Sequence, residues 1–225
     1  MAQRSTRGHR ADALTRAFYE RDALVVARAL IGTYLVVTHS REDVRVARIV
    51  ETEAYRGPKD LACHARAGMT KRTKTLYGPP GHAYVFLIYG MYDCFNVVCF
   101  GEGKGHAVLV RGVEPIVGVP HDMRTDGPGR LTRALGITRN DDATDLVQGT
   151  RIHLSPRTTR PRIETTARVG VAYAGEWADY AWRFLDAGST HVSKPSPRTI
   201  GRGSVTGASV PGRSDRSRRG GRAVD

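Results

Sequence analysis

The alternation of apolar and polar residues along this chain predicts a protein built mainly of short strands. The predicted strands are rich in β-branched and aromatic residues and are bounded by Gly, Pro or short polar segments. Because the connection His39–Asp43 is short and polar, the first two strands should form a hairpin, and Gly101–Gly105 should make the turn of a later pair. The strands are expected at Tyr34–Thr38, Val44–Ala54, Ala83–Tyr89, Phe95–Phe100, His106–Gly112, Ile152–Ser155, Ala167–Ala172 and Trp182–Asp186.

Two helices carry start and stop signals. Asp22 is placed to cap the N-terminus of a helix over Ala23–Ile31, and Gly32 is placed to end it. In the segment Gly127–Gly136, Pro128 lies near a helix start and Gly136 at its stop. Since tight turns join the strands as often as helices do, the pattern favours an α+β domain with a mixed, largely antiparallel sheet over a doubly wound fold.

Composition divides the 225 residues into three parts. Residues 1–14 form a polar, basic lead that we expect to be flexible, and residues 15–193 fit one domain. In residues 194–225, Ser, Gly, Pro and Arg dominate, and eight Lys or Arg stand against two Asp. This tail is predicted to be disordered. Two roles fit it equally well: loose binding of DNA through counterion release, or solubilisation.

The net charge of +13 indicates a polyanionic partner, most often nucleic acid, although an Arg-rich composition alone gives the same sign. No apolar run approaches the roughly 20 residues of a spanning helix, and the N-terminal residues lack the apolar core of a secretory signal. The cysteines Cys63, Cys94 and Cys99 form no CxxC pair, which fits a reducing cytosol. We therefore expect a cytoplasmic protein without a membrane partner, whose thiols are small core residues or bystanders rather than metal ligands.

The strand Val44–Ala54 carries the first candidates for chemistry. Strand periodicity places Glu51 and Glu53 on one face, with Tyr55 following if the strand continues. The Gly57-Pro58 turn comes next, and catalytic groups are common where a strand opens into a loop. A Glu-X-Glu pattern is more often solvated surface, so spacing alone leaves both interpretations open.

The loop after this strand holds two further polar residues. Asp60 precedes Leu61–His64 and is expected to cap a short helix there. His64 is either a structural hydrogen-bonding residue or a member of a pocket that it shares with Glu53.

The block Gly78–Asn96 is dense in aromatic residues. Tyr84, Phe86, Tyr89 and Tyr92 follow a Gly-Pro-Pro-Gly turn. Such residues are by default part of a core. Beside a Pro-Gly loop and in a basic protein, the alternative is a surface that stacks on nucleobases or wedges between them.

Five long motifs, in this order, resemble the alkyladenine (3-methyladenine) DNA glycosylase family. The resemblance runs from about Asp22 to Ser193. It implies a curved sheet with surrounding helices and a protruding β-hairpin, a monomer, double-stranded DNA with damaged purines as the partner, and no cofactor. The motifs are IVETEAYRGPKDLACHA (Ile49–Ala65), GPPGHAYVFLIYGMYDCFNVV (Gly78–Val98), VLVRGVEP (Val108–Pro115), GPGRLTRALGI (Gly127–Ile137) and AGEWADYAWRF (Ala174–Phe184).

The resemblance also implies roles for individual residues at the base. Glu53 matches the glutamate that activates the attacking water, and Arg111 matches an arginine near that water and the DNA backbone. The side chains that sandwich the flipped base are matched by Tyr55, His64 and Phe86. Family members commonly have Tyr at the Phe86 position, so the ring is kept and its hydroxyl is lost. Asn96 matches the asparagine at the purine edge that helps reject guanine.

A separate set of residues is implied for the DNA helix. Tyr89 matches the residue that enters the minor groove and fills the gap left by the flipped nucleotide, with Met91 and Tyr92 as the next candidates. A regular strand would place Phe86 and Tyr89 on opposite faces. We therefore expect Gly90 to end the strand and re-aim Tyr89.

The chemistry is coherent without the family. Cleavage of an N-glycosidic bond creates oxocarbenium character at the sugar, which a carboxylate stabilises while it takes a proton from water. No lysine stands within Glu51–Tyr55 or Tyr84–Asn96, which favours a monofunctional glycosylase without lyase activity. Two alternatives remain: a non-catalytic, structure-specific DNA-binding module, and a metal-dependent nuclease built on Glu51, Glu53, Asp60 and His64. The preferred lesion stays open among 3-methyladenine, hypoxanthine, ethenoadenine and 7-methylguanine.

Overall fold

The computed structural model describes residues 13–194, so the predicted lead and tail lie almost wholly outside the described residues. Leu14 is already buried in the core, and its N–H donates to the carbonyl of Leu154. The folded domain therefore begins no later than Leu14.

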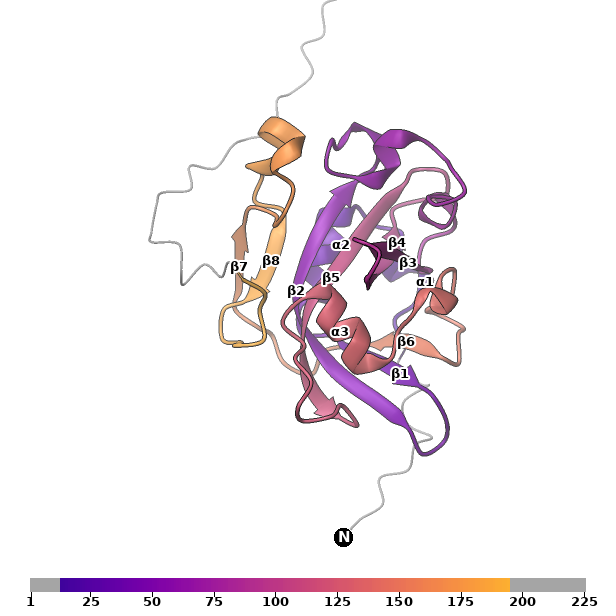
Figure 1. Ribbon diagram of the computed structural model, residues 1–225, viewed down its shortest axis with the longest axis vertical. Helices are drawn as coiled ribbons and strands as arrows, with labels where there is room; N and C mark the ends of the chain where they lie inside the picture. The colour runs from indigo at the N-terminus through magenta and orange to yellow at the C-terminus, as the bar shows by residue number, and fades with distance from the viewer. Residues whose placement is uncertain (1–12, 195–225) are drawn as a thin grey trace, which may run out of the picture.

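One curled sheet organises the domain (Figure 1). Its strand order is β3-β4-β5-β2-β1-β6, and β8 joins β2 and carries β7 on its other side. Every pairing between these strands is antiparallel, so the α+β class is confirmed and the sheet has no parallel pair. The strands are β1 (Tyr34–Thr38), β2 (Val44–Arg56), β3 (Ala83–Ile88), β4 (Tyr92–Cys99), β5 (His106–Val117), β6 (Ile152–Ser155), β7 (Ile163–Thr166) and β8 (Arg183–Asp186).

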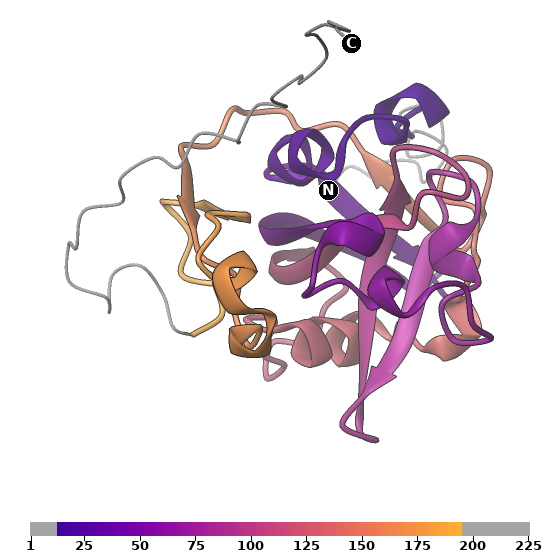
Figure 2. The same cartoon turned by 90° about the horizontal axis from the view of Figure 1, so that it is seen from above.

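The helices are short and lie around the sheet, with α2 and α3 on opposite faces of it (Figures 1 and 2). Both keep the predicted caps. Asp22 accepts a hydrogen bond from the N–H of Leu24, and Gly136 adopts a left-handed conformation that ends α3. The α-helices are α1 (Arg16–Tyr19), α2 (Ala23–Leu30) and α3 (Pro128–Leu135), and the 3₁₀ helices are η2 (Gly57–Lys59), η3 (His64–Ala67), η4 (Thr75–Tyr77), η5 (Arg139–Asp141) and η6 (Ala172–Ala178).

Strand β2 is the central strand of the sheet and has partners along both edges. One edge pairs with β5 over most of its length. The other edge pairs first with β1 and then, from Glu51 to Glu53, with β8. Both glutamates are therefore enclosed by strands on either side, and neither is exposed to solvent. The solvated-surface interpretation of the Glu-X-Glu pattern is wrong.

The β3–β4 hairpin protrudes from the body of the molecule (Figure 2). Ile88 pairs with Tyr92, so the turn consists of residues 89–91. Strand β3 ends before Tyr89, and both Tyr89 and Gly90 have positive φ, at 53° and 69°. A left-handed tyrosine is uncommon, and here the turn directs its side chain away from the strand's regular alternation. Tyr89 is accordingly 82% exposed.

Two local predictions are wrong. Ala167–Ala172 is not a strand: the strand in this region is Ile163–Thr166, and in the following segment the N–H of Val169 donates to the Glu53 side chain instead of a neighbouring strand. Asp60 does not cap η3, whose N-cap is Cys63. Its carboxylate accepts instead from the backbone N–H groups of Arg56 and Ala62.

The three cysteines are buried free thiols, as predicted. Burial raises the pKa of both Cys63 and Cys94 to about 11. Both therefore stay protonated near pH 7 and behave as small apolar core residues.

Candidate functional site

A cavity of about 880 Å³ opens between the β3–β4 hairpin, β5, the start of α3 and the loops that carry residues 62–64 and 169–171. Strands and loops that are distant in sequence thus supply one site. Glu53 lies behind the wall of this cavity, and Met91 is outside it. The predicted site residues that line the cavity are Tyr55, His64, Phe86, Tyr89, Tyr92, Asn96 and Arg111.

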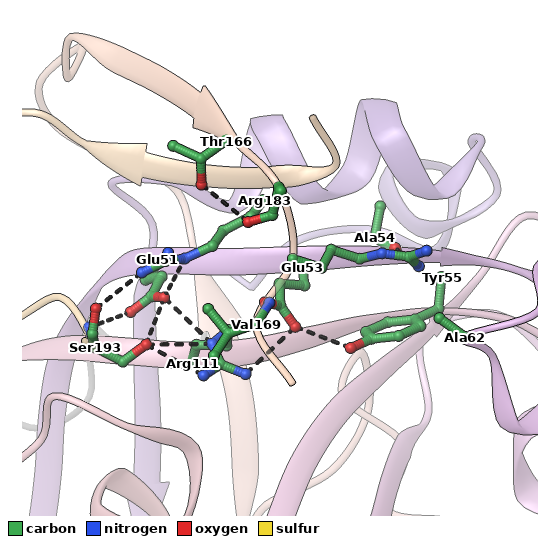
Figure 3. Close-up of polar contacts among 12 residues, drawn as sticks. Glu51, Glu53, Ala54, Tyr55, Ala62, Arg111, Thr166, Val169, Arg183 and Ser193 are labelled. Atoms are coloured by element: carbon green, nitrogen blue, oxygen red, sulfur yellow. Dashed lines mark hydrogen bonds and ion pairs between the residues drawn. The ribbon is translucent and has the colours of Figure 1, made fainter. Parts of the chain in front are cut away.

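The carboxylate of Glu53 is fully buried and held by three donors (Figure 3). Its Oε2 accepts from the Tyr55 hydroxyl at 2.9 Å and from Arg111 Nη1 at 3.4 Å, and its Oε1 accepts from the N–H of Val169 at 2.7 Å. All three of these neighbours line the cavity. A carboxylate oxygen offers two lone pairs, so Oε1 keeps one acceptor position after bonding Val169.

Glu51 has a different environment, although it is two positions away on the same face. Its Oε1 accepts from Arg183 Nε at 2.7 Å and from the Ser193 hydroxyl at 2.7 Å, and its Oε2 accepts from the Ser193 N–H at 2.5 Å. Figure 3 shows this cluster at the left, further along β2 from Tyr55, with Glu53 between them. Glu51 is absent from the cavity wall. These bonds make it a structural carboxylate that fixes the end of the described chain.

Gly112 explains how Ser193 reaches Glu51. It lies opposite Glu51 in the β2–β5 register, and a Cβ there would approach the His191 carbonyl oxygen to 2.5 Å. Only glycine leaves room for the returning segment against β5.

Arg111 joins the two glutamates. Its Nε is 3.2 Å from Glu51 Oε1, and its Nη1 is 3.4 Å from Glu53 Oε2. Burial alone would lower the pKa of Arg111, but the charges of Glu53 and then Glu51 outweigh it and raise the pKa above its usual value. Two buried carboxylates and the buried cations Arg111 and Arg183 therefore balance one another.

Aromatic rings form the opposite part of the cavity. His64 and Phe86 have ring centroids 4.5 Å apart, and Tyr84 lies 5.2 Å from Phe86. His64 Nδ1 is 3.2 Å from the Tyr84 hydroxyl. Burial, followed by the charge of Arg72, lowers the pKa of His64 below its usual 6.5, so the imidazole is neutral at pH 7.

The side chain of Asn96 is fixed by its own hairpin. Its Nδ2 donates to the carbonyls of Tyr84 at 3.0 Å and Cys94 at 3.2 Å. Both amide protons are thereby used, and the orientation of the amide is set. Only the carbonyl oxygen of Asn96 retains hydrogen-bonding capacity, as an acceptor.

The residues at the hairpin tip are not equivalent. Tyr89 and Met91 are 82% and 70% exposed, whereas Tyr92 is 48% exposed. Tyr92 packs against Gly129 of α3. A Cβ added at Gly129 would lie 2.7 Å from the Cβ of Tyr92. Tyr89 and Met91 thus project freely, and Tyr92 anchors the hairpin to the helix.

Comparisons with known proteins identify the family. The methylpurine-DNA glycosylase family model matches residues 17–190. The chain belongs to the methylpurine-DNA glycosylase family. A Myxococcus xanthus protein named "Putative 3-methyladenine DNA glycosylase" is 53% identical over 186 residues, covering 82% of this chain and 95% of that one. Relatives with the same name occur in Anaeromyxobacter dehalogenans, at 50% identity over 82% of this chain and 88% of its own, and in Legionella pneumophila (strain Lens), at 47% over 80% and 98%.

Membership of the methylpurine-DNA glycosylases agrees with the sequence resemblance and supports an enzyme that removes alkylated bases from DNA. Within residues 13–194, no helix is long and apolar enough to cross a membrane. The same part of the chain contains no group of three or more His, Cys, Asp or Glu side chains that could hold a metal ion.

Sequence reasoning missed the residues that hold the glutamates from outside β2. Val169 supplies a backbone N–H, which carries no side-chain signal in the sequence. Ser193 and Arg183 lie more than 130 positions from Glu51, so only the fold brings them together. Sequence reasoning also missed Arg168, which forms a buried ion pair with Asp60. The charge of Asp60 was the signal for it, because a buried carboxylate needs a cationic partner.

Proposed function

We propose that this protein flips an alkylated or deaminated purine out of duplex DNA and hydrolyses its N-glycosidic bond with a water that Glu53 activates. This reaction starts base excision repair. The observation that carries the proposal is the buried Glu53 carboxylate, held by groups that line an aromatic-walled cavity. The described domain supplies every part of this site, so we expect it to act as a monomer.

The remaining lone pair of Glu53 Oε1 can accept a proton from water at the cavity floor. The carboxylate then also stabilises the positive charge that develops on the sugar. Arg111 orients the Glu53 carboxylate through its charge, and its bond to Glu51 fixes the guanidinium. Because Glu51 is already bonded to Arg183 and Ser193, the catalytic role falls to Glu53.

The rings of Tyr55, His64 and Phe86 provide stacking surfaces for the extracted base. Alkylation at N3 or N7 makes a purine cationic, and a cation is attracted to electron-rich ring faces. A neutral His64 adds no opposing charge. A damaged base also costs less to unpair and unstack, which adds selectivity.

The approach to the cavity is basic, which suits a DNA backbone. Arg124, Arg130 and Arg133 line its α3 side, and all three are exposed. Lys194, at the end of the described chain, is also exposed and lines the cavity. Cations at such positions attract phosphates and position the duplex without reading its sequence.

We also infer that the enzyme is monofunctional. Lyase chemistry needs an amine at the sugar carbon, and the groups that contact Glu53 are a phenol, a guanidinium and a backbone amide. Lys194 is the amine to test, because it lines the cavity. Borohydride should trap no covalent complex with lesion-containing DNA. Trapping that Lys194→Gln abolishes would overturn this part.

One assay distinguishes the function from its alternatives. Duplexes with single 3-methyladenine, 7-methylguanine, hypoxanthine or ethenoadenine lesions are incubated with enzyme, and strand breaks are compared with and without hot alkali. A glycosylase releases free base, gives breaks only after alkali and keeps its activity in EDTA. A binding module releases nothing, and a metal-dependent nuclease cuts without alkali and stops in EDTA. The nuclease would need metals to displace the arginines that already pair with Glu51 and Asp60.

A further inference from the structure

Arg168 is a buried cation that lies over the ring of Tyr55 and is absent from the cavity wall. It lies in the irregular segment between β7 and η6, and its side chain has no solvent exposure. Its two terminal nitrogens bond both oxygens of Asp60, at 2.6 and 3.0 Å. They also donate to the carbonyls of Ala54 and Trp177, each at 3.0 Å. This guanidinium therefore ties together β2, the loop after it and η6.

The guanidinium also lies over two aromatic rings. Its central carbon is 4.8 Å from the Tyr55 ring centroid and 4.9 Å from that of Trp182. Tyr180 stacks on Trp182 at 5.0 Å. Tyr55 thus has Arg168 and a column of rings behind it, which limits how far its ring can tilt.

The residue after Arg168 completes the connection to the catalytic carboxylate. Val169 donates its N–H to Glu53 Oε1, and the Tyr55 hydroxyl donates to Glu53 Oε2. Arg168 fixes the chain that carries the first donor and supports the ring that carries the second. Both hydrogen bonds to Glu53 from neutral groups therefore depend on one side chain that does not itself touch Glu53.

We propose that Arg168, held by Asp60, is a positioning residue that sets the orientation of Glu53 and Tyr55 for base excision. This inference rests on the proposed function. A buried ion pair alone is weak support for stability, because desolvation offsets much of its attraction. The Nε of Arg168 is also buried without a hydrogen-bond partner among the described residues, which adds a further cost. Retention of such a group is better explained by the geometry that it imposes.

Arg168→Lys is the main test. Lysine keeps the charge beside Asp60 but cannot form the planar fork or stack over the rings. The maximal single-turnover excision rate should fall about 10- to 100-fold, as expected when a catalytic group is slightly misplaced. Affinity for a duplex with a tetrahydrofuran abasic analogue should stay within about two-fold, because that ligand places no base in the cavity.

Arg56→Lys is the matched control. Arg56 also lies over Trp182, at 5.6 Å, and pairs with Asp22 at 2.8 Å, but its guanidinium contacts neither Tyr55 nor Val169. The Arg56→Lys variant should leave both the excision rate and the affinity unchanged.

If Arg168→Lys excises at the wild-type rate, or loses rate and abasic-analogue affinity in parallel, Arg168 is structural only. If Arg168→Lys does not fold, Trp182→Leu is the second test, because it keeps the ion pair between Arg168 and Asp60. Trp182→Leu should lower the excision rate by a smaller factor and leave abasic-analogue affinity unchanged. An unchanged excision rate in Trp182→Leu overturns the proposal. Failure of the proposed function is a separate result, seen as no base release by the wild type.

Discussion

The hydroxyl of Tyr55 donates a hydrogen bond to Glu53 Oε2, 2.9 Å away, from two positions along the same strand. Strand geometry places both side chains on one face, and the cavity opens at that face. Burial and the charge of Glu53 raise the pKa of Tyr55 well above its usual value, so the phenol remains a donor at every working pH. In the proposed function, this one residue offers a ring to the base and donates a hydrogen bond to the catalytic carboxylate.

Tyr55→Phe should separate these two contributions. The ring is kept, so affinity for lesion-containing duplex should change by less than about three-fold. The lost charge-assisted hydrogen bond, worth about 1.5–3 kcal/mol, should lower the single-turnover excision rate roughly 10- to 100-fold. The two quantities are measured on the same duplex by gel shift and alkaline cleavage. A rate equal to that of the wild type would mean that this hydrogen bond does not orient Glu53.

The two glutamates should fail in different ways. Glu53→Gln should lower the excision rate by several orders of magnitude while lesion binding is retained, because the general base and the charge stabiliser disappear together. Glu51→Gln weakens the buried bonds to Arg183 and Ser193, and breaking such an ion pair costs about 3–5 kcal/mol. Its main effect should be a lower Tm in thermal melts, with a smaller loss of rate per folded molecule. If Glu51→Gln alone abolished excision, the assignment of the catalytic role to Glu53 would be wrong.

Phe86 and Tyr89 should act at different steps. Phe86→Tyr should be nearly neutral, and Phe86→Ala should lose about 1–3 kcal/mol of base stacking. Tyr89→Ala should instead reduce the population of the flipped state, most strongly for hypoxanthine in a stable pair and least in a mismatch. Fluorescence of 2-aminopurine beside the lesion and single-turnover rates on both duplexes measure this.

Met91→Ala is the comparison at the hairpin tip, because Met91 is 70% exposed and lies outside the cavity wall; a larger defect in Met91→Ala than in Tyr89→Ala would make Met91 the wedge. Equal losses for Tyr89→Ala on paired and mispaired duplexes would show that Tyr89 is not the wedge. Tyr92 is a poorer alternative, since it packs against Gly129 of α3.

The neutral state of His64 should make lesion preference depend on pH. Its pKa is depressed from 6.5, so the imidazole gains a proton only as the pH falls below that value. A protonated His64 would repel a cationic 7-methylguanine more than a neutral hypoxanthine. The ratio of the 7-methylguanine excision rate to the hypoxanthine excision rate, measured from pH 7.5 to 5.5, should therefore decrease as the pH is lowered. Protonation of groups that serve both substrates cancels in this ratio, and His64→Phe should make it flat. A flat ratio in the wild type would exclude the effect.

The basic tail should contribute to DNA affinity from the rim of the site. Ser193 is fixed to Glu51, and Lys194 lines the cavity, so the described part of the chain ends beside the proposed DNA surface. Deleting residues 196–225 should leave the single-turnover rate nearly unchanged. It should weaken nonspecific affinity and flatten its dependence on salt, because fewer counterions are released. Identical salt slopes for the full and shortened proteins would favour a tail that serves solubility alone.

The local pattern of residues was sufficient for much of this protein. The Asp22 and Gly136 caps, the strands from Tyr34–Thr38 to Ile152–Ser155 and the shared face of Glu51, Glu53 and Tyr55 follow from neighbouring residues and strand periodicity. Long ordered motifs also identified the family. These features depend on interactions within a few positions of the chain, and a sequence records such interactions directly.

The tertiary structure decided which groups hold each glutamate. Spacing treats Glu51 and Glu53 alike, but Ser193 and Arg183 return to one and Val169 to the other. The expected strand Ala167–Ala172 failed for the same reason, because the N–H of Val169 bonds to Glu53 instead of a neighbouring strand, and the side chain of Arg168 bonds to Asp60. Contacts across more than a hundred residues depend on how the sheet curls, and no local pattern specifies them.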